Sequence, residues 1–148
     1  MRKISVILLT AFSIWLGGGI IPSNMMPHVY AASSYWNGDR NYPLLQHLQR
    51  NWKDYYTYLD SSSVVVKKDE SHDHHIDIIW AQNHLKVSDN QVKEVSTYWF
   101  RDYNGTMYVS SNGQNWRQFD PFDTSDAYGA VAAGCREGWK VAFGVVFS

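Results

Sequence analysis

Two Asn-Gly dipeptides, Asn104-Gly105 and Asn112-Gly113, constrain the fold of this chain more than any other feature of its sequence. An Asn-Gly pair favours the type I′ turn of a tight β-hairpin, because both central residues of that turn need a positive φ. The segment before the first pair, 92–101, alternates between two faces, and shorter β-prone segments follow at 107–110 and 115–119. The three segments and two turns predict a β-meander.

Further strands are predicted upstream of the meander. An aromatic segment at 55–59, a segment with three consecutive valines at 63–68 and an apolar segment at 76–85 are all typical of strands. We expect turns at Asp60-Ser61-Ser62 and Ser88-Asp89-Asn90, and a polar loop over 69–75. Before them, Leu44, Leu45, Leu48 and Trp52 recur at helical spacing behind Pro43, which predicts a short helix over 43–52.

After Asp120-Pro121 the apolar pattern changes to the period of a helix. Asp123, Thr124 or Ser125 is a suitable cap, and Gly144 a suitable end. Residues of one apolar stripe follow at 3.6-residue spacing: Tyr128, Val131, Ala132, Cys135, Trp139 and Ala142. A last short strand is predicted over 145–147. The fold class expected is α+β, an antiparallel β-meander of about five strands packed by the C-terminal helix.

The first 31 residues have the three-part pattern of a secretory signal peptide. A basic start, Arg2-Lys3, precedes an uncharged apolar segment over 4–21, and Val29 and Ala31 occupy the specificity positions of a cleavage site. We therefore expect cleavage between Ala31 and Ala32, with an uncleaved membrane anchor as the alternative. The mature chain is then one α+β domain, 32–148, whose residues 32–41 form a flexible leader. The predicted location is the periplasm or the extracellular space.

Charge and cysteine content narrow the possible partners. Without Arg2 and Lys3, 11 basic residues of the 13 remain against 14 acidic ones, which gives the mature chain a net charge of −3. An acidic domain of this kind offers no electrostatic surface for nucleic acid. Cys135 is the single cysteine, so no disulfide can form within the chain. No second apolar segment is long enough to suggest another membrane span.

Two segments carry a resemblance to known proteins: Tyr58-Leu59-Asp60-Ser61-Ser62-Ser63-Val64 and Tyr98-Trp99-Phe100. Over about residues 55–119 the chain resembles small exported proteins of Gram-negative-type Firmicutes, and it is more distantly similar to the surface-adhesin protein E family. That similarity implies an antiparallel sheet with a packed helix and an association with host extracellular matrix. The adhesin family is largely lipid-anchored, whereas this chain lacks the cysteine for an anchor, and no binding residue is carried over.

Candidate sites for chemistry are few. His72 and His74 are the candidate metal ligands, since they can share a face of an extended chain, but a solvated hairpin loop is the preferred interpretation. Cys135 lies on the apolar helix stripe and is interpreted as a buried small hydrophobe rather than a nucleophile. Carboxylates for a glycosidase-type pair would come from a set at turns and caps: Asp60, Asp77, Glu94, Asp102, Asp120, Asp123 and Asp126. We assign no catalytic residue and expect no cofactor.

The sequence thus favours a secreted or envelope-associated protein that is not an enzyme, a binding or adhesin-like module whose partner is a protein or extracellular matrix. The alternative is a small secreted enzyme or enzyme inhibitor. A large exposed patch of Trp and Tyr would favour binding. A concave pocket with convergent histidine or carboxylate groups would favour an enzyme.

Overall fold

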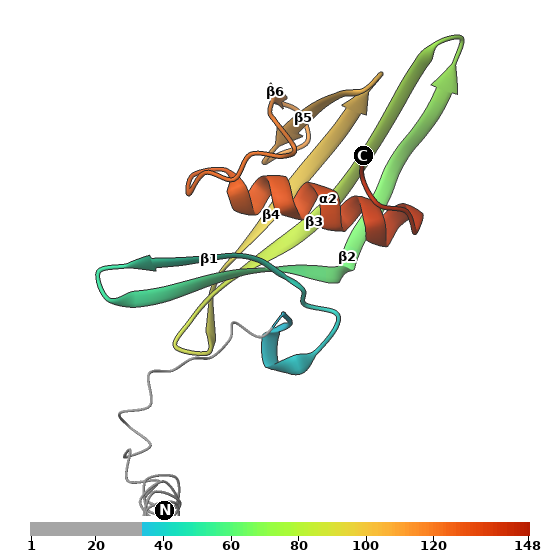
Figure 1. The fold of residues 1–148 in the computed structure, drawn as a ribbon. Coiled ribbons are helices and arrows are strands. Elements are labelled where there is room, and N and C mark those ends of the chain that lie inside the picture. Colours follow the sequence, from blue (N-terminus) through green and yellow to red (C-terminus); the bar gives the residue numbers. More distant parts are fainter. Residues whose placement is uncertain (1–33) are drawn as a thin grey trace, which may run out of the picture. The chain divides into compact units, whose positions relative to one another are not determined.

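The chain forms one antiparallel sheet in which each strand pairs with its neighbours in sequence. The computed structural model describes residues 34–148, and within them the strand order is β1-β2-β3-β4-β5-β6. The strands are β1 (Leu44–Arg50), β2 (Lys53–His72), β3 (His75–Ser88), β4 (Gln91–Tyr103), β5 (Thr106–Ser110) and β6 (Arg117–Gln118). The predicted antiparallel meander is confirmed, with six strands among the described residues (Figure 1).

Two-residue turns make the first four connections of the sheet. The turn residues are Asn51-Trp52, Asp73-His74, Asp89-Asn90 and Asn104-Gly105, and both residues of each pair have positive φ. The flanking residues pair directly across each turn, as Arg50 does with Lys53 and Tyr103 with Thr106. These are the backbone requirements of a type I′ hairpin. The Asn104-Gly105 turn confirms the strongest local signal in the sequence.

The Asn112-Gly113 pair forms a longer loop instead of a two-residue turn. The Asn112 side-chain oxygen accepts hydrogen bonds from the backbone N–H groups of Gln114 and Asn115, at 2.9 and 3.0 Å. Gly113 has a φ of 76° and lies against the Trp99 ring, where a Cβ would come within 3.0 Å of Cδ2. The loop therefore follows the sheet surface and leaves β6 only two residues long.

Strand β2 is longer than the sequence predicted. The prediction of a turn at Asp60-Ser61-Ser62 is wrong, because the chain passes these residues as an irregularity within one 20-residue strand. The Asp60 carboxylate accepts the Ser62 N–H at 3.1 Å, and Ser63 Oγ accepts the Asn83 N–H at 2.7 Å, which bridges the bulge to β3. The polar loop predicted over 69–75 is likewise a β-ladder that closes in a two-residue turn.

The helix predicted over 43–52 is also wrong, since Leu44–Arg50 is strand β1. Its three leucines span little more than one helical turn, and short apolar segments do not distinguish a helix from a strand. Pairing with the aromatic start of β2 decides the outcome: Leu48 lies opposite Tyr55, and Leu44 opposite Tyr58. The Asn51-Trp52 turn then reverses the chain where the helix was expected to end.

Helix α2 (Gly129–Phe143) crosses one face of the sheet (Figure 1). It begins later than predicted, although Ser125 Oγ accepts the Tyr128 N–H at 3.3 Å, as a capping hydroxyl does. Gly144 ends the helix with a φ of 71°, as predicted. The strand predicted over 145–147 is wrong, because this segment has no ladder partner and Phe147 packs on Trp139 instead, with ring centroids 5.5 Å apart.

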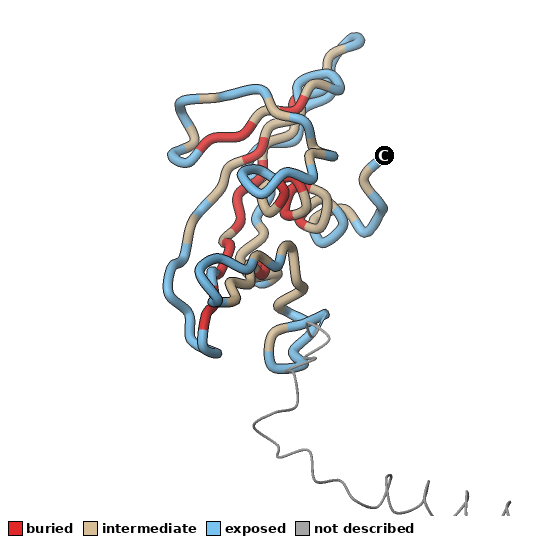
Figure 2. The backbone as a smooth tube through the Cα atoms, turned by 60° about the vertical axis from the view of Figure 1, so that its left-hand side comes forward, coloured by how far each residue is buried: buried red, intermediate tan, exposed pale blue. Residues whose placement is uncertain are grey.

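Two apolar clusters lie within the described residues. The first lies between α2 and the sheet and joins Trp80, Phe100 and Cys135 with Met107 and Val109. The second joins Tyr58, Leu85 and Val87, and Trp36 and Tyr42 pack against it. The short helical turn η1 (Trp36–Gly38) belongs to the segment predicted as a flexible leader, and from Ser34 onward this segment is hydrogen-bonded to the rest of the fold, with Leu44 N donating to Ser34 O at 2.9 Å. Figure 2 shows the buried residues along the central strands.

The predicted signal peptide, 1–31, and its cleavage site at Ala31 and Ala32 lie outside the described residues. Across 34–148, no helix has the length and apolar character needed to cross a membrane.

Candidate functional site

Strand β3 presents a graded row of side chains to the face that α2 covers. Alternate residues Trp80, Gln82, His84 and Lys86 share this face, because successive strand residues point to opposite sides. Trp80, Gln82 and His84 are buried, whereas Lys86 is exposed. On β4, Phe100, Tyr98, Ser96 and Glu94 pair with these four residues in the same order. The face thus changes from apolar to charged as it passes out from under the helix.

Two glycines of α2 allow the helix to lie directly on the polar part of this row. Gly134 and Gly138 are one helical turn apart and both buried. A Cβ at Gly138 would overlap Gln82 Oε1, and a Cβ at Gly134 would overlap the His84 ring at Cε1 and Nε2. The helix backbone and the two β3 side chains are therefore in contact without room for a methyl group.

A chain of buried hydrogen bonds fixes the state of His84. The Trp80 indole N–H, which can only donate, donates to Gln82 Oε1 at 3.1 Å. Gln82 Nε2 donates to the Gly134 carbonyl oxygen at 2.7 Å, and lies 2.7 Å from His84 Nε2. Because these partners fix the orientation of the Gln82 amide, its second N–H donates to His84 Nε2. Nε2 is then an acceptor, and the proton of the neutral imidazole lies on Nδ1.

His84 stays neutral in this environment. Burial disfavours the charged imidazolium and lowers the pKa of His84 from 6.5 to about 3. Its Nδ1 is buried and has no hydrogen-bond partner among residues 34–148. A buried N–H without a partner costs about 1–3 kcal/mol, so such groups in folded proteins call for a specific explanation.

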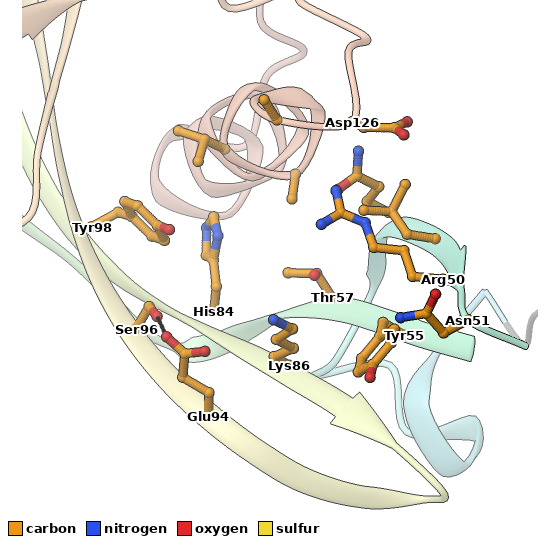
Figure 3. A pocket seen from close by; sticks show the side chains of 15 residues that line it. Arg50, Asn51, Tyr55, Thr57, His84, Lys86, Glu94, Ser96, Tyr98 and Asp126 are labelled. Carbon is orange, nitrogen blue, oxygen red and sulfur yellow. Dashed lines mark hydrogen bonds between the residues drawn. The ribbon is translucent and has the colours of Figure 1, made fainter. Parts of the chain in front are cut away.

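A pocket of about 660 Å³ lies beside the ring of His84. We call it the His84 pocket. Its wall is formed by the β1–β2 hairpin (Gln46, Leu48, Arg50, Asn51, Tyr55, Thr57), by β3 and β4 (His84, Lys86, Glu94, Ser96, Tyr98), and by the start of α2 with the residues before it (Asp126, Ala127, Ala130, Val131). In Figure 3, His84 rises from β3 toward the helix at one side of the pocket.

The polar groups of the His84 pocket are only partly engaged with each other. Lys86 lies over the Tyr55 ring, with Nζ 5.5 Å from the ring centroid. Glu94 accepts a hydrogen bond from Ser96 Oγ at 3.1 Å. Glu94 and Asp126 lie on opposite sides of the pocket, and Arg50 extends into it from the β1–β2 hairpin (Figure 3). The pocket therefore offers donors and acceptors of both charges to a bound molecule.

The candidate metal ligands lie far along the sheet from this pocket. His72 ends β2 and His74 occupies the two-residue turn, and both are exposed. His72 Nε2 is 3.6 Å from Glu70 Oε2, while His75 packs against Tyr103 with ring centroids 4.2 Å apart. Residues 34–148 contain no group of three or more His, Cys, Asp and Glu side chains placed to hold a metal ion.

Cys135 lies at the apolar contact between α2 and the sheet. The side chain is fully buried, and burial raises the pKa of its thiol. A thiol in this state is a poor nucleophile, because the thiolate is the reactive form.

The candidate carboxylates mostly have structural partners. Asp102, Asp120 and Asp123 accept backbone N–H groups in turns, and Asp60 accepts one at the irregularity within β2. Asp77 is buried and paired with Arg101 Nε at 3.0 Å and Lys68 Nζ at 3.3 Å. Glu94 and Asp126 are brought to the same pocket, which the sequence did not indicate.

Comparison with known proteins adds no assignment: no family model, curated protein or solved structure matches this chain. The resemblance to the surface-adhesin protein E family stays a prediction.

Proposed function

We propose that this protein is an exported binding protein that is not an enzyme, and that it holds a small polar molecule in the His84 pocket. The pattern of residues 1–31 supports export. The size of the pocket supports a small ligand, since about 660 Å³ lies within the usual range for such sites.

The observation that carries this proposal is the unpartnered N–H of His84. Its tautomer is fixed by Gln82, and its position beside the pocket is fixed by the glycine contact with α2. A ligand oxygen that accepts this hydrogen bond would remove the cost of burying the group. The fold thus holds the His84 ring rigidly at the edge of a cavity before any ligand arrives, which lowers the ordering cost of binding.

The same geometry disfavours acid–base catalysis by His84. A general base needs a free lone pair and a pKa near the working pH. The lone pair of His84 Nε2 accepts a hydrogen bond from Gln82, and the pKa of His84 is lowered to about 3. His84 is therefore suited to donate a hydrogen bond to a ligand and not to take a proton from it.

One observation favours the alternative of a small secreted enzyme. Glu94 and Asp126 line the same concave pocket, and two carboxylates that flank a ligand are the requirement for glycoside hydrolysis. The alternative is tested by the same experiment, because an enzyme would turn over a ligand that a binding protein returns unchanged.

The experiment is a ligand titration of the exported protein, produced from the full chain and followed by ¹H–¹⁵N NMR. Long-range ¹⁵N spectra of the histidine rings should show His84 neutral with its proton on Nδ1 at pH 7. A panel of neutral sugars, amino acids, dicarboxylates and amines is then added. We expect saturable shift changes at residues of the His84 pocket for at least one class, with Kd below about 1 mM, or about −4 kcal/mol.

Two variants locate the binding. Ala130→Leu fills the His84 pocket from α2 and should abolish the shifts, while Val141→Leu, at an exposed position of the same helix, should leave them unchanged. A proton on Nε2, or no saturable shift with any class, would contradict the proposal. Chemical conversion of a bound compound would establish the enzyme alternative in its place.

A further inference from the structure

The charges that line the His84 pocket cancel. Arg50 and Lys86 are opposed by Glu94 and Asp126, and His84 is held neutral. A site of this composition does not concentrate ligands of one charge, as an anion or cation site does. The ligand it fits best carries no net charge and can both donate and accept hydrogen bonds.

Hydroxyl groups meet that requirement. Each hydroxyl supplies one donor and two acceptor lone pairs. Lys86 and Glu94 are directly paired across β3 and β4, so a donor and an acceptor stand side by side on the pocket wall. His84 lines the same pocket, and its unpartnered N–H is buried at the edge of that pocket. Adjacent hydroxyls of one ligand can thus bind a cation, a carboxylate and the imidazole without leaving a buried charge unpaired.

Aromatic surface lies in and beside the same pocket. Tyr55 and Tyr98 line it, and the neighbouring turn exposes Trp52, a residue that is 95% accessible. Trp52 is not itself a lining residue, but it directly follows Asn51, which is one, so the indole is carried by the hairpin that forms one wall. Large flat aromatic side chains that also tolerate water are favoured at binding surfaces.

The backbone at Trp52 makes this exposure significant. Trp52 has a φ of 62° at the second central position of a type I′ turn, where glycine is preferred. A bulky residue with positive φ is a conformational outlier, and such outliers concentrate at functional sites. Packing does not explain the indole, because it lies in solvent. Contact with a bound ligand would explain why this indole is exposed.

We infer that the ligand of the His84 pocket is a neutral saccharide, whose hydroxyls bind Lys86, Glu94 and His84 and whose apolar ring face stacks on Trp52. This inference rests on the proposed binding function of the pocket. A neutral saccharide is the ligand class that fits the balanced charges, the mixed donors and acceptors, and the exposed aromatic platform together.

The experiment uses the exported protein with defined probes, measured by calorimetry and by tryptophan fluorescence. The saccharide probes are the trimer of N-acetylglucosamine, cellotriose and maltotriose, and the charged probes are glycylglycine and glutamate. Trp52→Gly removes the platform while improving the turn, because glycine adopts positive φ without cost. His74→Gly is the matched control, since His74 holds the same position of a type I′ turn at the other end of the sheet.

We expect at least one saccharide to bind, with affinity weakened at least about tenfold by Trp52→Gly and unchanged by His74→Gly. Ala130→Leu should abolish that binding. Binding of a charged probe alone would overturn the saccharide inference and leave the proposed function standing. No binding of any probe, in a protein whose NMR panel is also negative, would overturn both. Saccharide binding that survives Trp52→Gly would overturn the role of the platform.

Discussion

The two ends of the ladder between β2 and β3 are stabilised by different interactions. Under α2, the β3 residues Trp80, Gln82 and His84 are buried, and the helix lies on the last two without room for a methyl group. At the other end, every β2 residue from Lys68 to the Asp73-His74 turn is exposed, whereas the β3 residues opposite are mostly half-buried and include the buried Asp77 (Figure 2). The covered end depends on the fit of side chains, whereas the exposed end depends on backbone pairing.

The exposed end compensates for its lack of cover with charge and irregularity. Lys68 bridges Glu70 and the buried Asp77, at 3.2 and 3.3 Å. One register shift, between Val66 and Lys68, interrupts the pairing of β2 with β3 where this end begins; the other, between Asp60 and Val65, lies opposite the covered Gln82. Lysines and bulges on a strand are devices that discourage pairing with another chain. The comparison therefore predicts that small substitutions under α2 lower the free energy of unfolding strongly, whereas substitutions at the exposed end of the β2–β3 hairpin change it little.

The largest effect expected is that of Gly138→Ala. The new Cβ would overlap Gln82 Oε1 and push α2 off the sheet, so the free energy of unfolding should fall by about 3 kcal/mol. Gly129→Ala is the matched control, because its closest Cβ contact is the end of the flexible Gln46 side chain, at 2.8 Å, and its contacts with the Thr124 backbone, at 3.4 and 3.5 Å, are ordinary ones. That variant should stay within about 1 kcal/mol of the parent in urea unfolding. Equal stability of the two variants would mean that α2 does not pack this closely.

Next in size is the loss of stability in acid through His84. The pKa of His84 is about 3 in the folded state and about 6.5 in the unfolded state, so between these values the unfolded chain binds the extra proton. The contribution of His84 to the free energy of unfolding is fully present above pH 6.5. Below that pH the free energy of unfolding falls by about 1.4 kcal/mol for each pH unit, a loss of about 2.7 kcal/mol at pH 4.5.

His84→Gln isolates this contribution, since the amide does not titrate near neutral pH. Urea midpoints of the parent and the variant, measured from pH 7.5 to pH 4.5, should converge as the pH falls, because only the parent loses the histidine contribution. Parallel pH profiles would show that His84 is protonated as easily in the folded protein as in the unfolded chain.

Trp139→Ala tests how much the apolar side chains of α2 contribute to the packing of the helix on the sheet. Trp139 is half-buried and contacts Trp80 and Phe143, with ring centroids 5.5 and 4.5 Å apart. The residue sealed in the core is Trp80, so Trp139 covers the core instead of filling it. We expect a loss of about 2 kcal/mol, below the 3–5 kcal/mol typical of a fully buried tryptophan. Val141→Ala, at an exposed position of the helix, should cost less than about 0.5 kcal/mol in the same urea titration.

Local signals in the sequence predicted the parts of the fold that local physics decides. Asn104-Gly105 needs positive φ at both positions and forms its turn, and the stripe through Ala132 and Cys135 packs on the sheet. The errors fall where pairing between distant segments decides. Leu44–Arg50 became a strand because β2 pairs with it, and the turn expected at Asp60 became a bulge because β3 continues alongside.

The His84 pocket was missed for a related reason. Its signal in the sequence is split between two distant segments. Trp80, Gln82 and His84 alternate on one strand face, and Gly134 and Gly138 recur one helical turn apart. Polar residues at core-facing strand positions suggest a surface strand until close-packing glycines are placed opposite them. That placement requires the position of α2 on the sheet, which no local pattern encodes.

The smallest effect is expected at the exposed tip of the β2–β3 hairpin, where His72 and His74 lie in solvent. His72→Ser together with His74→Asn should change the free energy of unfolding by less than about 0.5 kcal/mol, because asparagine also tolerates the positive φ of 73° at position 74. His75 is left unchanged, since its ring contacts Tyr103. Melting temperatures of the parent and the double variant should also respond equally to added Zn²⁺. A rise with zinc in the parent alone would mean that the two histidines hold a metal, and that this end of the ladder is stabilised by more than backbone pairing.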